Sequence, residues 1–269
     1  MQSDTVSRNL SASSAESARL SARRAFYLAD QANETARALA PRLKAGEGLS
    51  DLPLGGEGLS PKELVLYGSL LYRALSVSEG TLLSYHSGGS RIAYMRQSYA
   101  DAAYTLFSDL LDGATVSYTD SSRAAAEEVF SEVADFCILP YSDREGSTVR
   151  ASRTVTETLG LRLVGRASVG AGDLGALTYA LYGRALLPPQ TDTVLIDLRL
   201  PAISPHALAC LAAASERVGA AVLELGGDNA ASVLHASLKV RRSELAHLTF
   251  IFEVSLPGTD VVGLSDADD

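Results

Sequence analysis

The chain has 269 residues, a length that predicts one or two domains of ~100–200 residues each. Hydrophobic residues make up 46% and charged residues 20%, which is typical of a globular protein and excludes collagen or disorder throughout. The formal net charge of −9 argues against a nucleic-acid-binding protein, because phosphate backbones attract clustered cations.

The cysteines and the hydropathy pattern indicate a cytoplasmic protein. Cys137 and Cys210 lie in apolar stretches without a CxxC spacing, which favours a reducing compartment over a disulfide framework. The first residues lack the features of a secretory signal, and no run of ~18 apolar residues predicts a membrane span. The scattered histidines predict no metal site, and we expect no cofactor.

Residues 1–88 are expected to form a helical segment. Ala, Leu, Arg and Glu dominate residues 15–44 and favour a helix, which a proline and a run of glycines then end. A second helix is predicted from Ser60, its N-cap, to about Leu83, with Glu63 completing a capping box. Residues 87–90, Ser-Gly-Gly-Ser, predict a flexible linker.

After this linker, short apolar runs alternate with helical patterns. Such alternation predicts a parallel, doubly wound α/β layer. The predicted strands cover residues 92–95, 115–118, 136–140 and 161–169, and the predicted helices cover 99–111, 121–132 and 149–158.

A third section begins near Leu177, and residues 178–187 within it suit either a helix or a strand. Further along, the pattern predicts a βαββ unit of ferredoxin-like type. Its predicted elements are a strand over 193–200, a helix over 204–218 ended by Gly219, strands over 220–225 and 248–256, and a turn at 226–229. Because few residues follow, we expect the last helix and strand of this unit to be missing.

Several segments, in this order, resemble motifs of the prephenate dehydratases, including the bifunctional chorismate mutase–prephenate dehydratases. Ile92–Met95 resembles that family's opening strand, and Leu161–Gly165 resembles its "LKIVGE" strand. Residues 134–149 resemble "ADYGVLPIENSxxGSV", and Thr178 opens the counterpart of "TRFL". The resemblance implies an α/β lobe built like half of a periplasmic binding protein.

The third section resembles the regulatory ACT domain of the same family, including its "PGAL" turn. The matching segments are Thr193–Leu200, Ser204–Leu208 and Thr249–Glu253. The resemblance implies an aromatic amino acid as ligand, with Ser204, His206, Ala207 and Leu208 as the candidate binding residues.

Departures from the family pattern affect the catalytic motifs. Thr178 keeps its place as the candidate catalytic residue, but Tyr179 replaces the Arg that follows it in the family. Prephenate carries two carboxylates, and a guanidinium is the natural bidentate partner for one of them. The "GPEGTFS" loop corresponds to residues 96–101, which lack glycine, and too few residues separate Val169 from Thr178 for a second lobe. We therefore expect the dehydratase chemistry to be lost.

The resemblance divides the chain into residues 1–88 at the chorismate mutase position, a dehydratase-like lobe over 91–175, and a shortened ACT-like domain over 176–269. In the first part, cations could hold a dianion as a mutase does, or they could form a solvated helix face, which we favour. These cations are Arg19, Arg23, Arg24, Arg37, Arg42, Lys44 and Arg73.

Residues 170–175 spell GxGxxG after a predicted strand, and Asp197 follows about twenty residues later. A dinucleotide site requires this turn to open a helix. We favour the alternative, a flexible connection in place of the lost lobe.

The leading hypothesis is a non-catalytic prephenate dehydratase-like protein with a regulatory or ligand-binding role linked to phenylalanine biosynthesis. We expect a homodimer, because the strand over 193–200 would have an open edge. Two alternatives stay open: an active chorismate mutase or prephenate dehydratase with a divergent site, and a structural or interaction protein without ligand. Neither nucleic acid nor membrane is expected as a partner.

Overall fold

The computed structural model describes residues 2–111, 113–142, 149–170, 176–228 and 232–267, with side chains from residue 16 onward except that of Asp228. It divides the chain into two units. One unit contains residues 1–82, 203–218 and 246–258, and the other contains residues 83–202, 219–245 and 259–269.

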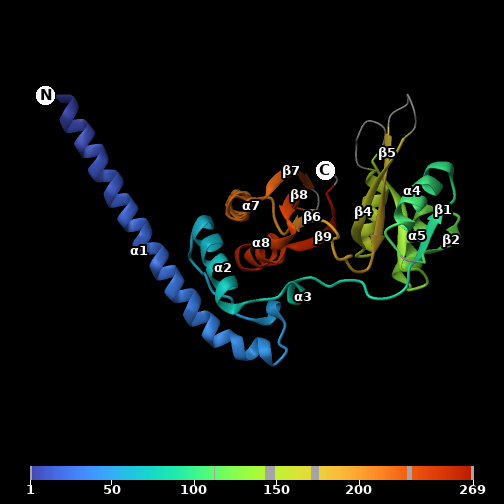
Figure 1. Ribbon diagram of the computed structural model, residues 1–269, viewed down its shortest axis with the longest axis horizontal. Coiled ribbons are helices and arrows are strands. Elements are labelled where there is room, and N and C mark those ends of the chain that lie inside the picture. Colours follow the sequence, from blue (N-terminus) through green and yellow to red (C-terminus); the bar gives the residue numbers. More distant parts are fainter. Residues whose placement is uncertain (1, 112, 143–148, 171–175, 229–231, 268–269) are drawn as a thin grey trace. The chain divides into compact units, whose positions relative to one another are not determined.

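The first unit is helical (Figure 1). Its elements are α1 (Gln2–Lys44), a 3-10 turn (Leu49–Asp51), α2 (Pro61–Leu75), α3 (Glu79–Leu82), α7 (Pro205–Val218) and most of α8 (Arg242–Ser255). Leu28 of α1, Leu71 of α2 and Phe250 of α8 belong to one buried apolar cluster. The Tyr67 hydroxyl fixes the chain that joins α1 to α2, because it donates to the Leu54 carbonyl oxygen at 2.9 Å.

The predicted capping box at the start of α2 is confirmed. The Glu63 carboxylate accepts hydrogen bonds from the Ser60 backbone nitrogen at 3.0 Å and from the Ser60 hydroxyl at 2.7 Å. Two predictions for this unit are wrong. Helix α1 begins at Gln2 and not near residue 15, whereas its end at Lys44, three residues after Pro41, agrees with the prediction. Helix α2 ends at Leu75, where Ser76 adopts a left-handed conformation with φ of 54°.

In the second unit, the described residues form one nine-stranded sheet in the order β2-β1-β3-β5-β4-β9-β6-β8-β7. The strands of its first half are β1 (Arg91–Met95), β2 (Thr115–Thr119), β3 (Phe136–Ser142), β4 (Arg162–Gly170) and β5 (Ala176–Gly183). Those of its second half are β6 (Thr193–Leu200), β7 (Ala221–Asp228), β8 (Val233–Arg241) and β9 (Asp260–Asp266).

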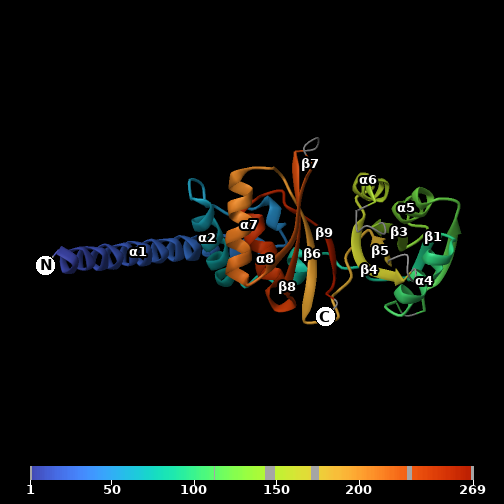
Figure 2. The ribbon, with the colours of Figure 1, turned by 90° about the horizontal axis from the view of Figure 1, so that it is seen from above.

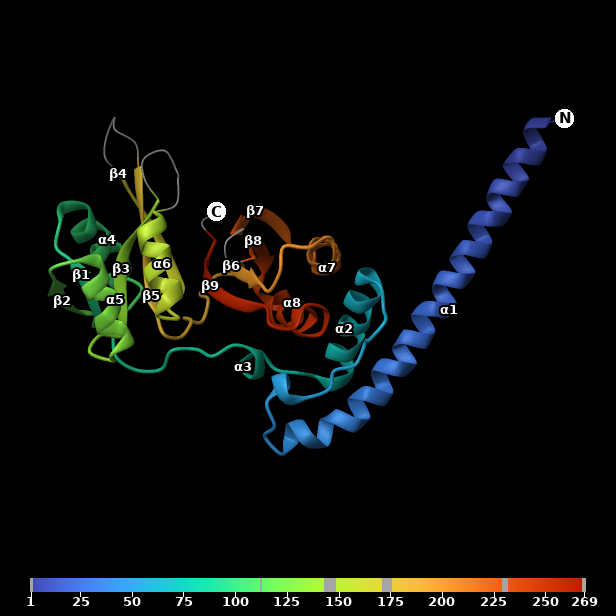
Figure 3. The same ribbon diagram turned by 180° about the vertical axis from the view of Figure 1, so that it is seen from behind.

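Helices α4 (Ser98–Ser108), α5 (Ser122–Phe130) and α6 (Arg150–Thr158) accompany the first half of the sheet (Figure 2; Figure 3). Ile92 and Tyr94 of β1 pack in one cluster with α4, whereas the intervening Ala93 packs in another with α5. Because successive strand residues face opposite sides, α4 and α5 cover opposite faces. With β2, β1 and β3 parallel, the predicted α/β layer is confirmed.

Residues 178–187, whose sequence suits either a helix or a strand, begin within strand β5. It pairs antiparallel with β3 on one side and with β4 on the other. The sequence prediction places a domain boundary between residues 175 and 176. This boundary would separate two paired strands, since Gly170 of β4 pairs with Ala176 of β5. Of the GxGxxG motif, residues 171–175 lie outside the described residues, and the next element is a strand. The helix that a dinucleotide site requires is thus replaced by β5.

The ferredoxin-like unit is not shortened, because its elements follow the complete order β6, α7, β7, β8, α8, β9. The strand predicted over 248–256 is wrong: these residues lie in α8 and just after it, and an apolar run buried on all sides has no periodicity to distinguish helix from strand. The turn predicted at 226–229 is also wrong for its first three residues, because β7 continues to Asp228. The fourth residue, Asn229, lies outside the described residues. Strand β9 pairs with β6, so the open edge on which we based the dimer is closed.

Across the described ranges, no helix is both long and apolar enough to cross a membrane.

Candidate functional site

Thr178 and Tyr179 lie on β5, within reach of the segment that follows β1. The Thr178 hydroxyl lies 3.4 Å from the Ser168 hydroxyl of β4. Tyr179 is only 5% exposed, and its hydroxyl oxygen accepts a hydrogen bond from Gln97 Nε2 at 3.1 Å. Burial, and to a lesser extent Tyr99, raises the pKa of Tyr179, so the phenol stays neutral at physiological pH. Residue 179 therefore carries no charge at this place in the fold.

The glycine-free segment after β1 is packed against aromatic rings. The Tyr94 hydroxyl donates to Asp101 Oδ1 at 2.8 Å, and the Tyr94 ring lies edge-on to Tyr118 at 5.4 Å between centroids. The Arg96 guanidinium lies over the Tyr118 ring at 5.1 Å. Arg96 Nε is also 4.0 Å from the Asp101 carboxylate, so this cation already has an anionic neighbour.

Ser204, His206, Ala207 and Leu208 lie at the start of α7 but do not converge on one place. Ser204 Oγ accepts a hydrogen bond from the Ala207 backbone nitrogen at 3.1 Å, which caps the helix. Ala207 is 1% exposed, whereas Leu208 is 40% exposed. His206 Nε2 lies 3.6 Å from Cys210 Sγ, a pairing that the four-residue spacing could have indicated. Their binding role stays a prediction.

Two cations of the first unit have carboxylate partners. Arg24 Nε lies 2.7 Å from Glu63, and an Arg42 nitrogen lies 2.6 Å from Glu47. Both pairs are exposed, which agrees with the solvated helix face that the sequence favours. No group of three His, Cys, Asp or Glu side chains in the described part of the chain could hold a metal ion.

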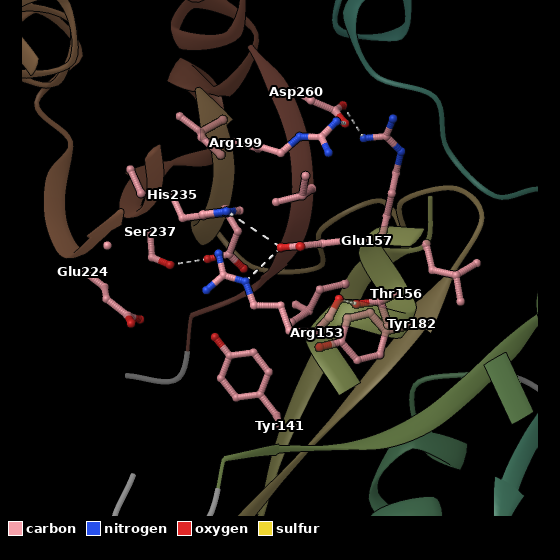
Figure 4. A pocket seen from close by; sticks show the side chains of 18 of the residues that line it. Tyr141, Arg153, Thr156, Glu157, Tyr182, Arg199, Glu224, His235, Ser237 and Asp260 are labelled. Atoms are coloured by element: carbon pink, nitrogen blue, oxygen red, sulfur yellow. Dashed lines mark hydrogen bonds and ion pairs between the residues drawn. The ribbon is translucent and has the colours of Figure 1, made fainter. Parts of the chain in front are cut away.

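A polar cavity of about 160 Å³ lies within the second unit (Figure 4). Its lining side chains come from β3, α6, β4, β5, β6, β7, β8 and β9. They include Tyr141, Arg153, Thr156, Glu157, Arg162, Leu163, Tyr182, Asp197, Arg199, Glu224, His235, Ser237, Asp260 and Val262. We call it the polar cavity.

At one end of the polar cavity, two arginines share one carboxylate. Arg162 lies 2.9 Å from Asp260 Oδ1, and Arg199 lies 3.3 Å from Asp260 Oδ2. Asp260 is the first residue of β9, whereas the arginines come from β4 and β6. Because one negative charge faces two positive charges, this end has a local excess of positive charge.

The middle of the polar cavity contains two further networks. Glu157 of α6 lies 2.8 Å from Arg153 Nε, one helical turn earlier, and 3.7 Å from His235 Nε2. Asp197 of β6 lies 2.5 Å from Arg166 and accepts a hydrogen bond from the Ser237 hydroxyl.

Arg166 itself is held on two sides. Its guanidinium lies over the Tyr141 ring at 4.6 Å. Burial acts most strongly and lowers the pKa of Arg166, but Asp197, Tyr141 and Tyr182 together raise it above its usual value. The Arg166 Nε atom is buried and makes no hydrogen bond among the described residues.

The remaining wall carries phenols and one carboxylate. Burial raises the pKa of both Tyr141 and Tyr182, so both hydroxyls stay protonated at physiological pH. Glu224 of the edge strand β7 is exposed, and Figure 4 shows its side chain beside the cavity. No sequence motif marks this site, because its residues are scattered along the chain and only the fold brings them together.

Comparisons with solved structures find prephenate dehydratases. The enzyme from Streptococcus mutans aligns with 65% of this chain and 97% of its own, at 12% identity and a TM-score of 0.51. The enzyme from Arthrobacter aurescens, solved in complex with L-Phe, aligns with 66% of this chain and 90% of its own, at 12% identity and a TM-score of 0.50. The chain therefore has a prephenate dehydratase-like fold.

A third structure, the quorum-quenching acylase GqqA, aligns with 67% of this chain and 97% of its own, at 17% identity. Its TM-score of 0.49 is too low to carry an argument about this chain. No protein-family model matches the sequence, and no curated protein matches it either.

Proposed function

We propose that the chain is a non-catalytic prephenate dehydratase-like protein that binds a small ligand and has a regulatory role linked to phenylalanine biosynthesis. The observation that carries this proposal is Tyr179, buried and bonded to Gln97, at the position of the family's Arg. A neutral phenol offers a carboxylate one hydrogen bond and no charge. Loss of a buried ionic partner costs about 2–5 kcal/mol of binding free energy.

The connection between β4 and β5 supports the loss of dehydratase chemistry. Gly170 pairs directly with Ala176, a separation too short for the second lobe that the resemblance implies. A substrate held by one lobe alone is open to water and is oriented from one side only. Residues 1–88, at the position of the chorismate mutase in the bifunctional enzymes, are proposed to have no mutase activity.

The ligand proposed here is an aromatic amino acid, bound in the cytoplasm. A solved structure of similar fold contains L-Phe, which supports this ligand class. A homodimer is also proposed, through a different edge from the one that the sequence suggested. Strand β7 ends the sheet and exposes Val222, Leu223 and Leu225, and an exposed edge with apolar side chains favours strand pairing.

Activity assays on the purified chain test the proposal. We expect no conversion of prephenate to phenylpyruvate and no consumption of chorismate above the uncatalysed rate, with an authentic prephenate dehydratase as positive control. We also expect L-phenylalanine to raise the melting temperature, because a ligand that binds only the folded state stabilises it.

Two variants distinguish real turnover from contamination. Thr178→Ala removes the candidate catalytic hydroxyl, and Ser168→Ala removes its neighbour 3.4 Å away. Turnover by the wild type that Thr178→Ala abolishes and Ser168→Ala retains would establish the active-enzyme alternative. No turnover together with no thermal response to phenylalanine, tyrosine or tryptophan would leave the interaction-protein alternative.

A further inference from the structure

The polar cavity has ends of opposite charge. At one end, the Asp260 carboxylate is shared by Arg162 and Arg199, which leaves an excess positive charge. At another end lies Glu224, which makes no ion pair with any residue whose side chain the structure describes. Figure 4 shows Arg199 and Asp260 on a different side of the cavity from Glu224.

The charges between these ends are already balanced. Asp197 has Arg166 as its cation, and Glu157 has Arg153. A ligand with one negative group or one positive group alone would therefore satisfy one end and leave the other unmatched. A molecule that carries both charges would match both ends.

The size and walls of the cavity limit the molecule further. A buried water needs roughly 10–15 Å³ on the same measure, so about 160 Å³ has room for on the order of ten non-hydrogen atoms. Leu163, Val262 and the rings of Tyr141 and Tyr182 line the same cavity and can contact an apolar or aromatic group.

We propose that the polar cavity binds an α-amino acid in its zwitterionic form. The ligand carboxylate would face Arg199 and Arg162, its ammonium group would face Glu224, and its side chain would pack on Tyr141 and Tyr182. This inference rests on the proposed ligand-binding function and gives that ligand a site made of residues other than Ser204, His206, Ala207 and Leu208, which the sequence predicted. The residues that would contact it lie on strands from both halves of the sheet, so binding would link the two halves.

Calorimetric titration with three probes of similar shape tests the two charge contacts separately. L-Phenylalanine carries both charges, 3-phenylpropionate lacks the ammonium group, and phenethylamine lacks the carboxylate. We expect the wild type to bind L-phenylalanine about tenfold or more tightly than either analogue, because each analogue leaves one charged group unmatched.

Substitutions should remove these preferences one at a time. Glu224→Gln should weaken L-phenylalanine binding by about tenfold and abolish its advantage over 3-phenylpropionate. Arg199→Gln should abolish its advantage over phenethylamine. The control variant Arg241→Gln, at the exposed last residue of β8, should bind all three probes as the wild type does.

The outcomes separate this inference from the proposed function. Undiminished L-phenylalanine binding by Glu224→Gln overturns the cavity as the site and leaves ligand binding elsewhere in place. Failure of the wild type to bind L-phenylalanine also overturns it. Prephenate turnover by the wild type overturns the non-catalytic function without affecting the site. Because Glu224 is exposed on an edge strand, its replacement by an isosteric amide leaves the core packing unchanged.

Discussion

Removing one partner of the ion pair between Arg166 of β4 and Asp197 of β6 should destabilise the protein more than removing one partner of an exposed ion pair. The two side chains are 21% and 14% exposed, and their atoms approach to 2.5 Å. Arg166→Met keeps much of the side-chain length but leaves the Asp197 carboxylate with the Ser237 hydroxyl as its described partner. Breaking a fully buried pair costs about 3–5 kcal/mol, and because water reaches part of this one we expect about 2–3 kcal/mol.

A double variant tests whether the loss comes from the unpaired charge. Replacing both partners by apolar residues removes the free-energy cost of burying an unpaired carboxylate, and such replacements often leave the stability unchanged. We therefore expect Arg166→Met/Asp197→Leu to be more stable than Arg166→Met alone. The control is Arg123→Met, which breaks an exposed pair with Glu127 on α5 and should cost about 0.5 kcal/mol or less.

Urea unfolding provides the measurement. The chain has no Trp, so far-UV circular dichroism is the suitable probe. A shift of the midpoint at unchanged slope reports the change in the free energy of unfolding. A cost for Arg166→Met no larger than that for Arg123→Met would refute the reasoning, as would a double variant less stable than the single one.

Two further predictions concern protonation. The hydrogen bonds from Ser60, together with the Arg24 guanidinium, lower the pKa of Glu63 to about 2, so its stabilising effect is complete above its usual pKa of 4.5 and is lost as the pH falls toward 2. Glu63→Gln should accordingly lower the melting temperature at pH 7, and the gap to the wild type should close between pH 4.5 and pH 2; a constant gap would contradict the assignment. Burial raises the pKa of both Cys137 and Cys210, so neither thiol should react with a disulfide reagent at mildly alkaline pH until the protein is unfolded, and rapid labelling of the native protein would show that one of them is accessible.

Elements with a local pattern could be predicted from the sequence. Strand β6 has the predicted bounds, because residues such as Val194 and Ile196 are buried and alternate with partly exposed ones. Helix α5 begins at Ser122, one residue after the start of its predicted range, and Ser121 caps it, because Ser121 Oγ accepts from the Ala124 backbone nitrogen at 3.1 Å. In both cases the information lies within a few consecutive residues.

Helix α8 and strands β8 and β9 were not predicted from the sequence, and the reason differs from one to the next. Helix α8 has Leu248, Phe250, Ile251 and Phe252 buried together, so no polar face marks its period. Strand β8 does alternate between more and less buried residues, and its pattern could have predicted a strand. Strand β9 is defined mainly by its pairing with β6, a partner far away in the sequence that no local pattern reveals.

The distribution of charge favours ligand binding over loss of every function. Tyr179 is neutral, whereas the polar cavity contains partly sheltered charges such as Arg199, Asp260 and Arg162. Sheltered charges gain little net stability, because desolvation offsets their attraction, and apolar replacements would serve the fold as well. An arrangement that leaves one excess cation at one end and Glu224 at another is therefore better explained by a ligand with both charges than by folding alone.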